Sequence, residues 1–251
     1  MELYEVGGCV RDELLGVKSK DIDFTVVLSP VEGDPFRAMV NRLKMMGFKV
    51  FLESPEFLTV RAQFPKGDQR VMELSRATLG RDGLTADFVL ARKESDYTDG
   101  RRPDKVEVGT LMDDLARRDF TMNAIAKDAD GVLHDPFNGV QDIEHRIIRA
   151  VGDPVERLAE DALRAVRAIR FAVTKRFNID MDLHFAIQDE SVLDAIENNI
   201  SDERIQVELS KMFRFDTPAS LHMLSGYPLL TNAMFSGSVS LDATMKQRGR
   251  G

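Results

Sequence analysis

Two aspartates one residue apart, Asp21 and Asp23, follow a glycine pair, Gly7 and Gly8, near the start of the chain. Carboxylate oxygens are the ligands that Mg²⁺ prefers, and two or three suffice because the ion keeps several waters. Glycines let main-chain N–H groups approach a phosphate, and a helix that begins after them directs its positive end to the same place. A glycine pair alone is typical of a turn. Combined with the aspartates it predicts an enzyme that moves a nucleotidyl group, because that chemistry depends on a metal and a phosphate cradle.

A strand must present the two aspartates on one side. The β-branched segment Asp21–Leu28 is the predicted strand, and side chains two residues apart on it share a face. We expect a third carboxylate from a neighbouring strand. Asp87, just before the apolar run of the predicted strand Ala86–Ala91, fits best, and Glu73 is the alternative. A pair of exposed strand aspartates without a metal is the other interpretation.

Strand-like and helical patterns alternate up to about residue 150. We expect helices at Val10–Leu15, Phe36–Met46 and Leu111–Ala126, strands at Lys49–Leu52 and Leu58–Gln63, and a loop over 65–83 with a strand at Arg70–Leu74.

From about Val151 the pattern becomes helical and lacks strand signals. It predicts helices at Val155–Phe177 and His184–Asn198, and a third helix after Ser201, which is suited to be its N-cap. The sequence therefore predicts an α+β fold, with a first domain at 1–150, a helical domain at 151–235 and a loose tail at 236–251.

Composition limits the function further. The chain has 251 residues, a net charge of -8 and one cysteine. One cysteine excludes an intramolecular disulfide and a cysteine-rich zinc site. The negative charge argues against strong non-specific nucleic-acid binding, although a local basic groove is compatible with it. The sequence has no membrane-spanning apolar run and no signal-peptide pattern, so we expect a cytoplasmic protein.

Six ordered motifs resemble those of class II tRNA nucleotidyltransferases (CCA-adding enzymes) and the related bacterial poly(A) polymerases, from about residue 5 to 213. They are GGCVRDELLG with DID (Gly7–Asp23), ARKESDYTDGRRP (Ala91–Pro103), DDLARRDFTMNAIA (Asp113–Ala126), DPFNGVQD (Asp135–Asp142), EDALRAVRAIRFA (Glu160–Ala172) and SDERIQVELSKM (Ser201–Met212). The resemblance implies a catalytic head with a small mixed sheet flanked by helices, followed by an all-α neck that selects the nucleotide.

The resemblance also implies residue roles. Asp21, Asp23 and Asp87 would be catalytic, and Asp21 and Asp23 would bind Mg²⁺ as the cofactor. The nucleotide-binding residues would be Gly7, Gly8, Arg11, Asp12, Arg92, Arg118, Asp119, Asn123, Asp161, Arg164, Arg167 and Arg170.

Asp161 and Arg164 carry the most specific expectation. On a helix they are i, i+3 neighbours on one face, and by spacing alone a surface salt bridge is the better interpretation. The family resemblance implies instead that they select the incoming base. A carboxylate can accept from the exocyclic amine of cytosine or adenine while a guanidinium donates to the ring nitrogen, a pattern that uracil and guanine reverse. CTP and ATP are therefore the expected substrates, and the loop Lys93–Pro103 is the segment expected to move between C and A addition.

The expected activity is addition of C and A to tRNA 3′ ends. CC-only, A-adding or poly(A) activity on another RNA is the alternative, and a non-catalytic CTP- or ATP-binding module is a further one. The Arg-Arg-Phe signature of bacterial poly(A) polymerases is missing from Glu53–Asp87, which favours tRNA. Family members continue with body and tail domains, whereas this chain ends about forty residues after its last motif. We expect a homo-oligomer or a partner chain to replace them.

Overall fold

The computed structural model describes residues 1–19, 21–65, 84–95 and 105–235. These residues divide into two compact units, the first extending to His145 and the second beginning at Arg146. Several predictions lie outside the described residues. They concern Glu73, the strand at Arg70–Leu74, most of the moving loop Lys93–Pro103 and the tail at 236–251.

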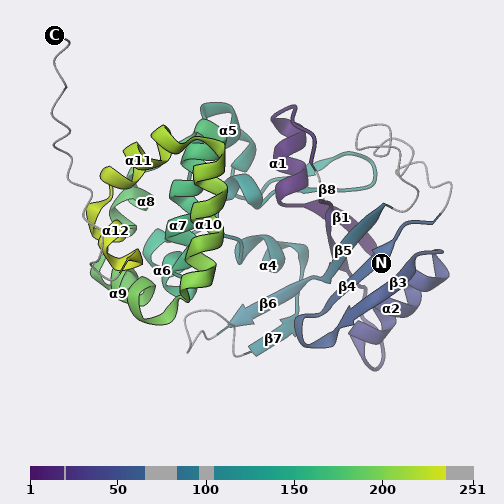
Figure 1. Cartoon of the computed structure of the whole chain (residues 1–251). Coiled ribbons are helices and arrows are strands. Elements are labelled where there is room, and N and C mark those ends of the chain that lie inside the picture. Colours follow the sequence, from purple (N-terminus) through teal and green to yellow (C-terminus); the bar gives the residue numbers. More distant parts are fainter. Residues whose placement is uncertain (20, 66–83, 96–104, 236–251) are drawn as a thin grey trace, which may run out of the picture. The chain divides into compact units, whose positions relative to one another are not determined.

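Seven strands of the described residues form one mixed sheet in the first unit, in the order β3-β4-β5-β2-β1-β8-β9 (Figure 1). Their bounds are β1 Glu2–Val6, β2 Asp23–Val27, β3 Lys49–Ser54, β4 Thr59–Gln63, β5 Thr85–Leu90, β8 Ala126–Lys127 and β9 Leu133–His134. The pair β2–β5 is parallel and the other neighbours are antiparallel. A separate hairpin consists of β6 (Arg92–Ser95) and β7 (Lys105–Val108).

Helices flank this sheet, which confirms the predicted α+β class. They are α1 Gly8–Leu14, α2 Pro35–Met45, α4 Leu111–Ala116 and α5 Gly139–His145, with short 3₁₀ turns η1 Pro55–Phe57 and η2 Thr121–Asn123. The amphipathic helix α2 contacts β3 and buries Phe36, Met39 and Leu43. Its Asp34 N-cap accepts a hydrogen bond from the Phe36 N–H, and a proline at the first helical position presets the backbone.

Alternation along β2 and β5 separates a core face from a polar face. Phe24 and Phe88 are adjacent in the register and their rings stack with centroids 5.1 Å apart. Phe48 and Phe64 pack against the same pair, so four phenylalanines form the centre of this core. Because side chains alternate, the residues just before Phe24 and Phe88 project from the opposite face.

The expected helix Leu111–Ala126 is wrong after Ala116. The Asp119 carboxylate accepts from the Phe120 N–H and the Asn123 side-chain amide, which stabilises a tight turn in place of a helix. Ala126 then pairs with Val6 of β1, so the sheet takes over the end of the predicted helix.

The second unit is mainly helical. Its elements are β10 Ile147–Ile148, α6 Pro154–Glu160, α7 Leu163–Phe171, the π-helical turn η3 Ala172–Arg176, β11 Asn178–Ile179, α8 Met181–Ala186, α9 Glu190–Asn199, α10 Asp202–Phe215, α11 Thr217–Ser225 and α12 Pro228–Met234. The helix predicted after Ser201 is confirmed as α10. The short parallel pair β10–β11 was not predicted, because two-residue strands carry no periodic signal.

Two predicted helices of this unit are broken. The helix expected at Val155–Phe177 stops at Glu160 because Asp161 is extended (φ -153°, ψ 98°) and its carboxylate accepts from the Leu163 N–H at the start of α7. The helix expected at His184–Asn198 is divided between α8 and α9, where Asp189 caps α9 through the Ser191 N–H. In both cases an aspartate satisfies the backbone donors of a new helix start.

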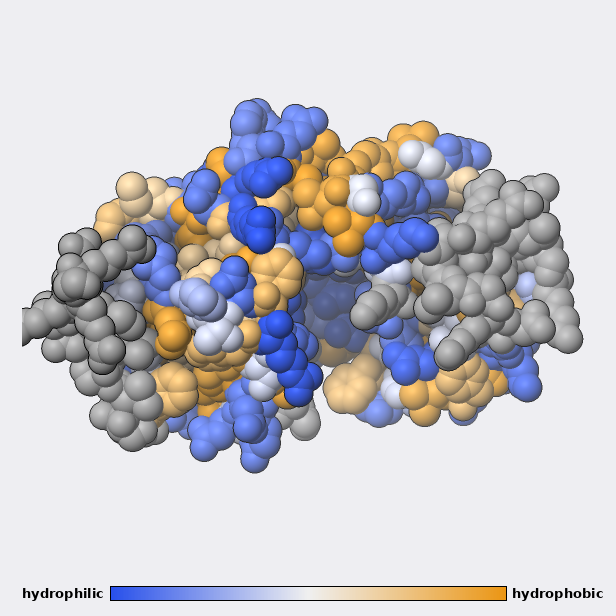
Figure 2. All heavy atoms as spheres, turned by 45° about the horizontal axis from the view of Figure 1, so that its top comes forward, coloured by the Kyte–Doolittle hydropathy of each residue, from blue (hydrophilic) through white to orange (hydrophobic). Residues whose placement is uncertain are grey.

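One face of the molecule shows how its hydropathy is distributed (Figure 2). On the face shown in Figure 2, apolar residues are interspersed among hydrophilic ones. No helix of the described residues has both the length and the apolar content needed to cross a bilayer.

Candidate active site

Two aspartates lie side by side on the polar face of the sheet in the first unit. Asp23 begins β2 and is the register partner of Asp87 on the parallel strand β5. The stacked Phe24–Phe88 pair on the opposite face fixes this register, since a slip of either strand by one residue would turn its ring out of the core. Arg61 of β4 is the next register partner of Asp87. We call these three residues, which lie in line across β2, β5 and β4, the carboxylate row.

Asp21 lies before β2, so strand alternation does not place it beside Asp23 as predicted. It nevertheless lines the same two pockets as Asp23, with volumes of about 350 Å³ and 370 Å³. The first pocket is also lined by Ile22, Arg61, Thr85, Ala86 and Asp87, and the second by Gly8, Cys9, Arg11, Asp12, Lys18 and Ser19.

The donor chemistry fits a hard divalent cation, because Asp21 and Asp23 offer carboxylate oxygens to shared pockets. Burial, and next the negative charge of Asp87, raises the pKa of Asp23 above its usual range, while Arg118 acts in the opposite direction. A bound cation would oppose both of the raising effects. Within the described residues, however, no three His, Cys, Asp or Glu side chains are grouped to hold a metal ion. Asp87 is already paired with a cation of the chain, because both of its carboxylate oxygens accept hydrogen bonds from Arg61.

Gly7 brings an arginine against the backbone. Its φ of 73° is disfavoured for other residues, and a Cβ there would lie 2.8 Å from Nη1 of Arg118. The helix α1 starts at the next residue, Gly8. Gly7 therefore lets the Arg118 guanidinium lie beside the start of a short helix. Phosphate binding at this place remains a prediction.

Four other predicted nucleotide ligands meet in one network. Nη1 of Arg11 donates to Oδ1 of Asn123 at 2.6 Å, and Nε and Nη2 of Arg11 donate to Oδ1 of Asp12 at 2.9 and 2.8 Å. The Asn123 amide in turn donates to Asp119 at 2.9 Å. Residues over a hundred positions apart are thus joined in one cluster, whose contact with a nucleotide remains a prediction.

Asp114 holds the two arginines of the RRDF segment (Arg117–Phe120), and it was not among the predicted site residues. This fully buried carboxylate accepts from Thr25 at 2.6 Å, from Nη2 of Arg117 at 2.5 Å and from Nη2 of Arg118 at 3.0 Å. Burial disfavours the charge, but Arg118 and Arg117 outweigh it and keep the pKa of Asp114 below its ordinary value. The sequence feature that could have identified Asp114 is its spacing, because Arg117 and Arg118 follow it by three and four positions in a helical segment.

Arg92 lies at the other end of this charge network. It donates to Glu94 through Nε at 2.6 Å and to the Phe57 carbonyl through Nη1. Glu94 also pairs with Arg117 at 3.3 Å. The structure therefore gives Arg92 local protein partners, and its predicted contact with a nucleotide remains a prediction.

In the second unit, Asp161 and Arg164 do not lie on one continuous helix as expected, because Asp161 separates α6 from α7. Each is held by a different neighbour. Nη2 of Arg204 donates to Oδ2 of Asp161 at 2.7 Å, and Nη1 of Arg164 donates to Glu160 and to the Arg157 carbonyl. Arg204 was not among the predicted site residues. The sequence feature that could have identified Arg204 is its position in the last family motif, Ser201–Met212.

The remaining predicted arginines lie over an aromatic ring. The guanidinium of Arg170 is 3.7 Å from the ring centroid of Phe171, and that of Arg167 is 5.5 Å away. Arg170 also forms an ion pair with Glu208, which is 4 % exposed. Burial opposes the charge of Glu208, but Arg170, then Lys211, holds its pKa below the usual range. The ion pair of Arg170 with Glu208 therefore holds this side of α7 against α10.

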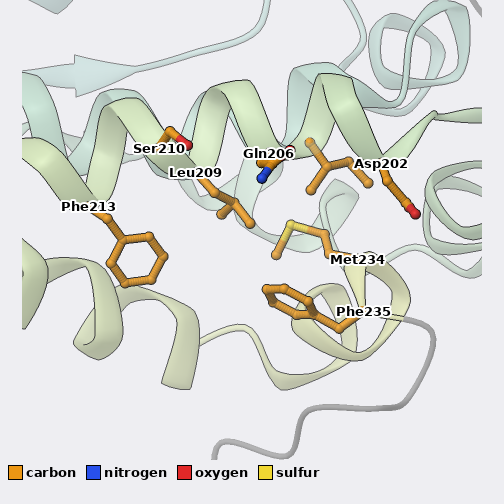
Figure 3. Close-up of a pocket in the computed structure, with 8 residues that line it drawn as sticks. Asp202, Gln206, Leu209, Ser210, Phe213, Met234 and Phe235 are labelled. Carbon is orange, nitrogen blue, oxygen red and sulfur yellow. The ribbon is translucent and has the colours of Figure 1, made fainter.

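A third pocket lies in the second unit, between α10 and the end of α12. It has a volume of about 540 Å³, and Figure 3 shows Leu209 and Gln206 of α10 opposite Met234 and Phe235. Of its described lining residues, Asp202 alone carries a charge. It therefore lacks paired acids for transfer chemistry, and the carboxylate row is the candidate active site.

Comparisons with known proteins agree in sequence and in structure. A CCA-adding enzyme of Levilactobacillus brevis is 38% identical over 218 residues, covering 86% of this chain and 47% of the relative. One of Lactobacillus helveticus is 39% identical over 212 residues, covering 84% and 46%. The chain spans about half the length of the curated relatives it matches.

Solved structures give the same result. A Bacillus stearothermophilus CCA-adding enzyme in complex with CTP has a TM-score of 0.67 at 31% identity, covering 89% of this chain and 47% of that one. A tRNA nucleotidyltransferase with a primer tRNA and an incoming ATP analog has a TM-score of 0.67 at 28% identity, covering 94% and 60%. The poly(A) polymerase head domain family matches residues 3–149, more than half of the sequence. The chain therefore belongs to the poly(A) polymerase head domain family.

Proposed function

We propose that this chain is a template-independent RNA nucleotidyltransferase that adds C and A to the 3′ ends of tRNA from CTP and ATP. The observation that carries the proposal is the pairing in register of Asp23 with Asp87, in a pocket that Asp21 shares. The likeness to CCA-adding enzymes in sequence and in structure supports the choice of substrates.

The reaction needs one bond made and one broken. The terminal 3′-hydroxyl oxygen of the RNA attacks the α-phosphorus, the bond from that phosphorus to the β-phosphate oxygen breaks, and pyrophosphate leaves while the hydroxyl proton passes to solvent. A divalent ion, for which we propose Mg²⁺, would polarise the α-phosphate and lower the pKa of the attacking hydroxyl. Asp21 and Asp23 would hold that ion through carboxylate oxygens.

We assign triphosphate binding to the cradle beside Gly7. Arg118 is fixed there by Asp114, and a guanidinium is a donor well suited to phosphate oxygens. The cluster of Arg11, Asp12 and Asn123 would hold the triphosphate and ribose, because it borders the pocket that also contains Asp21 and Asp23.

We assign base selection to Asp161 and Arg164. Arg204 and Glu160 restrict the rotation of the two side chains, so that a base must match their donors and acceptors as they stand. Uracil or guanine would place a carbonyl opposite Asp161 and an N–H opposite Arg164. Two charged groups would then lose their hydrogen bonds, which discriminates strongly.

The test is incubation with tRNA that lacks its 3′ CCA, Mg²⁺ and each labelled nucleoside triphosphate, alone and in pairs. The proposal predicts two C additions with CTP, a further A when ATP is also present, and no incorporation from UTP or GTP. Long A tails, or product that stops after C or contains only A, would assign one of the narrower activities instead. Absence of any magnesium-dependent incorporation would refute the proposal.

A further inference from the structure

Arg61 lies at the end of the carboxylate row. Arg61 of β4 faces Asp87 of β5 across the antiparallel register, and Asp87 adjoins Asp23 of β2. Nε of Arg61 donates to Oδ1 of Asp87 at 2.6 Å and Nη2 donates to Oδ2 at 2.5 Å. This fork-to-fork pairing uses both carboxylate oxygens in the plane where a metal ion would otherwise bind.

The pair contributes little to the fold. The Arg61 side chain is 49% exposed and that of Asp87 27%, and exposed ion pairs contribute only about 0–1 kcal/mol to stability. Its position is the informative feature, since both residues line the pocket that Asp21 and Asp23 also line. Arg118 also acts on Asp23, but its guanidinium is bound to the buried Asp114.

We propose that Arg61 takes the place of a second divalent ion at Asp87, so that the pocket lined by Asp21, Asp23 and Asp87 binds one ion tightly, through Asp21 and Asp23. The inference rests on the proposed function, because it describes the metal site of that reaction. Asp87 acts here as the anchor of a built-in cation, and a second ion must displace a bidentate guanidinium before it reaches those oxygens. Arg61 is therefore a positioning residue that sets the number of bound ions.

The test measures ion binding directly. Free Mn²⁺, used alone as the probe, is titrated into the full chain and followed by electron paramagnetic resonance. We expect one tight ion in the wild type. Arg61→Met should strengthen the second site at least about thirtyfold, the effect of removing a unit charge about 4 Å from a divalent ion even at the dielectric constant of water. Arg61→Lys, which keeps the charge, should keep the single tight site.

The matched control is Arg37→Met, which loses the same charge from an exposed ion pair with Glu53 outside the row. It should bind Mn²⁺ as the wild type does. Asp87→Asn should leave the tight ion in place, because the inference assigns that ion to other carboxylates. Far-UV circular dichroism confirms that each variant is folded.

Three results would overturn the inference: two equally tight ions in the wild type, an unchanged isotherm in Arg61→Met, or loss of the tight site in Asp87→Asn. Nucleotide incorporation by the wild type is measured in parallel. Incorporation without the predicted Mn²⁺ behaviour refutes the role of Arg61 alone, whereas the predicted Mn²⁺ behaviour without incorporation refutes the proposed function alone.

Discussion

Replacing Asp114 by asparagine should destabilise the first unit more than any neighbouring acidic change. The carboxylate is fully buried and binds Thr25, Arg117 and Arg118 at 2.5–3.0 Å. Removing one partner of a buried ion pair typically costs about 3–5 kcal/mol. The side chains of Arg117 and Arg118 are 21% and 19% exposed, so water can solvate them in part. We therefore expect the lower end, about 3 kcal/mol.

The adjacent residue supplies the control. Asp113 accepts from the backbone and hydroxyl of Thr110 in the capping box of α4, nearer the surface, so Asp113→Asn should cost about 1 kcal/mol. Urea unfolding followed by far-UV circular dichroism compares the two variants, since the chain has no tryptophan to report by fluorescence. Equal costs for the two substitutions would refute the assigned role of Asp114.

Three more predictions use other parts of the structure. The pKa of Asp114 is lower in the folded chain than its ordinary value, so its contribution is present above that value and lost in acid. The stability gap between wild type and Asp114→Asn should therefore narrow as the pH falls below about 4, and a constant gap in urea titrations would contradict this. Gly7→Ala should weaken nucleotide binding at least about tenfold, because the new methyl group displaces Arg118 from its place. Gly131→Ala has a similar φ and open space around it, so an equal loss of CTP affinity in both variants would count against the cradle. Arg204→Leu should raise UTP incorporation relative to CTP, and Arg204→Lys should restore selectivity in part. An unchanged ratio in single-nucleotide assays would mean that Arg204 does not position Asp161.

The elements with strong periodic signals were predictable. The segment around Asp23 alternates polar and apolar residues and forms the predicted strand. The helix α2 follows apolar spacing of helical period, and the strand containing Asp87 follows its apolar run. The motif order also indicated the family, which the match over residues 3–149 confirms. For elements that bury one face, the local residue pattern and the family resemblance led to the same prediction.

The sequence could not show where side chains interrupt a periodic pattern. Apolar spacing continues across Asp161, and only its capping contact to Leu163 reveals the helix boundary. The strand at Ala126 is two residues long, too short for any periodicity. The pairing of Arg61 with Asp87 depends on strand register across 26 positions, which no local pattern encodes.

The central claim is that a divalent ion held by Asp21 and Asp23 enables nucleotidyl transfer. The direct measurement is magnesium-dependent incorporation of labelled CTP into tRNA lacking its 3′ CCA, by wild type, Asp23→Asn and the control Asp130→Asn, which changes an exposed turn of the same unit. Loss of several kcal/mol of transition-state stabilisation predicts a rate about a thousandfold lower for Asp23→Asn, with Asp130→Asn unchanged. Near-normal turnover by a folded Asp23→Asn protein would contradict the account.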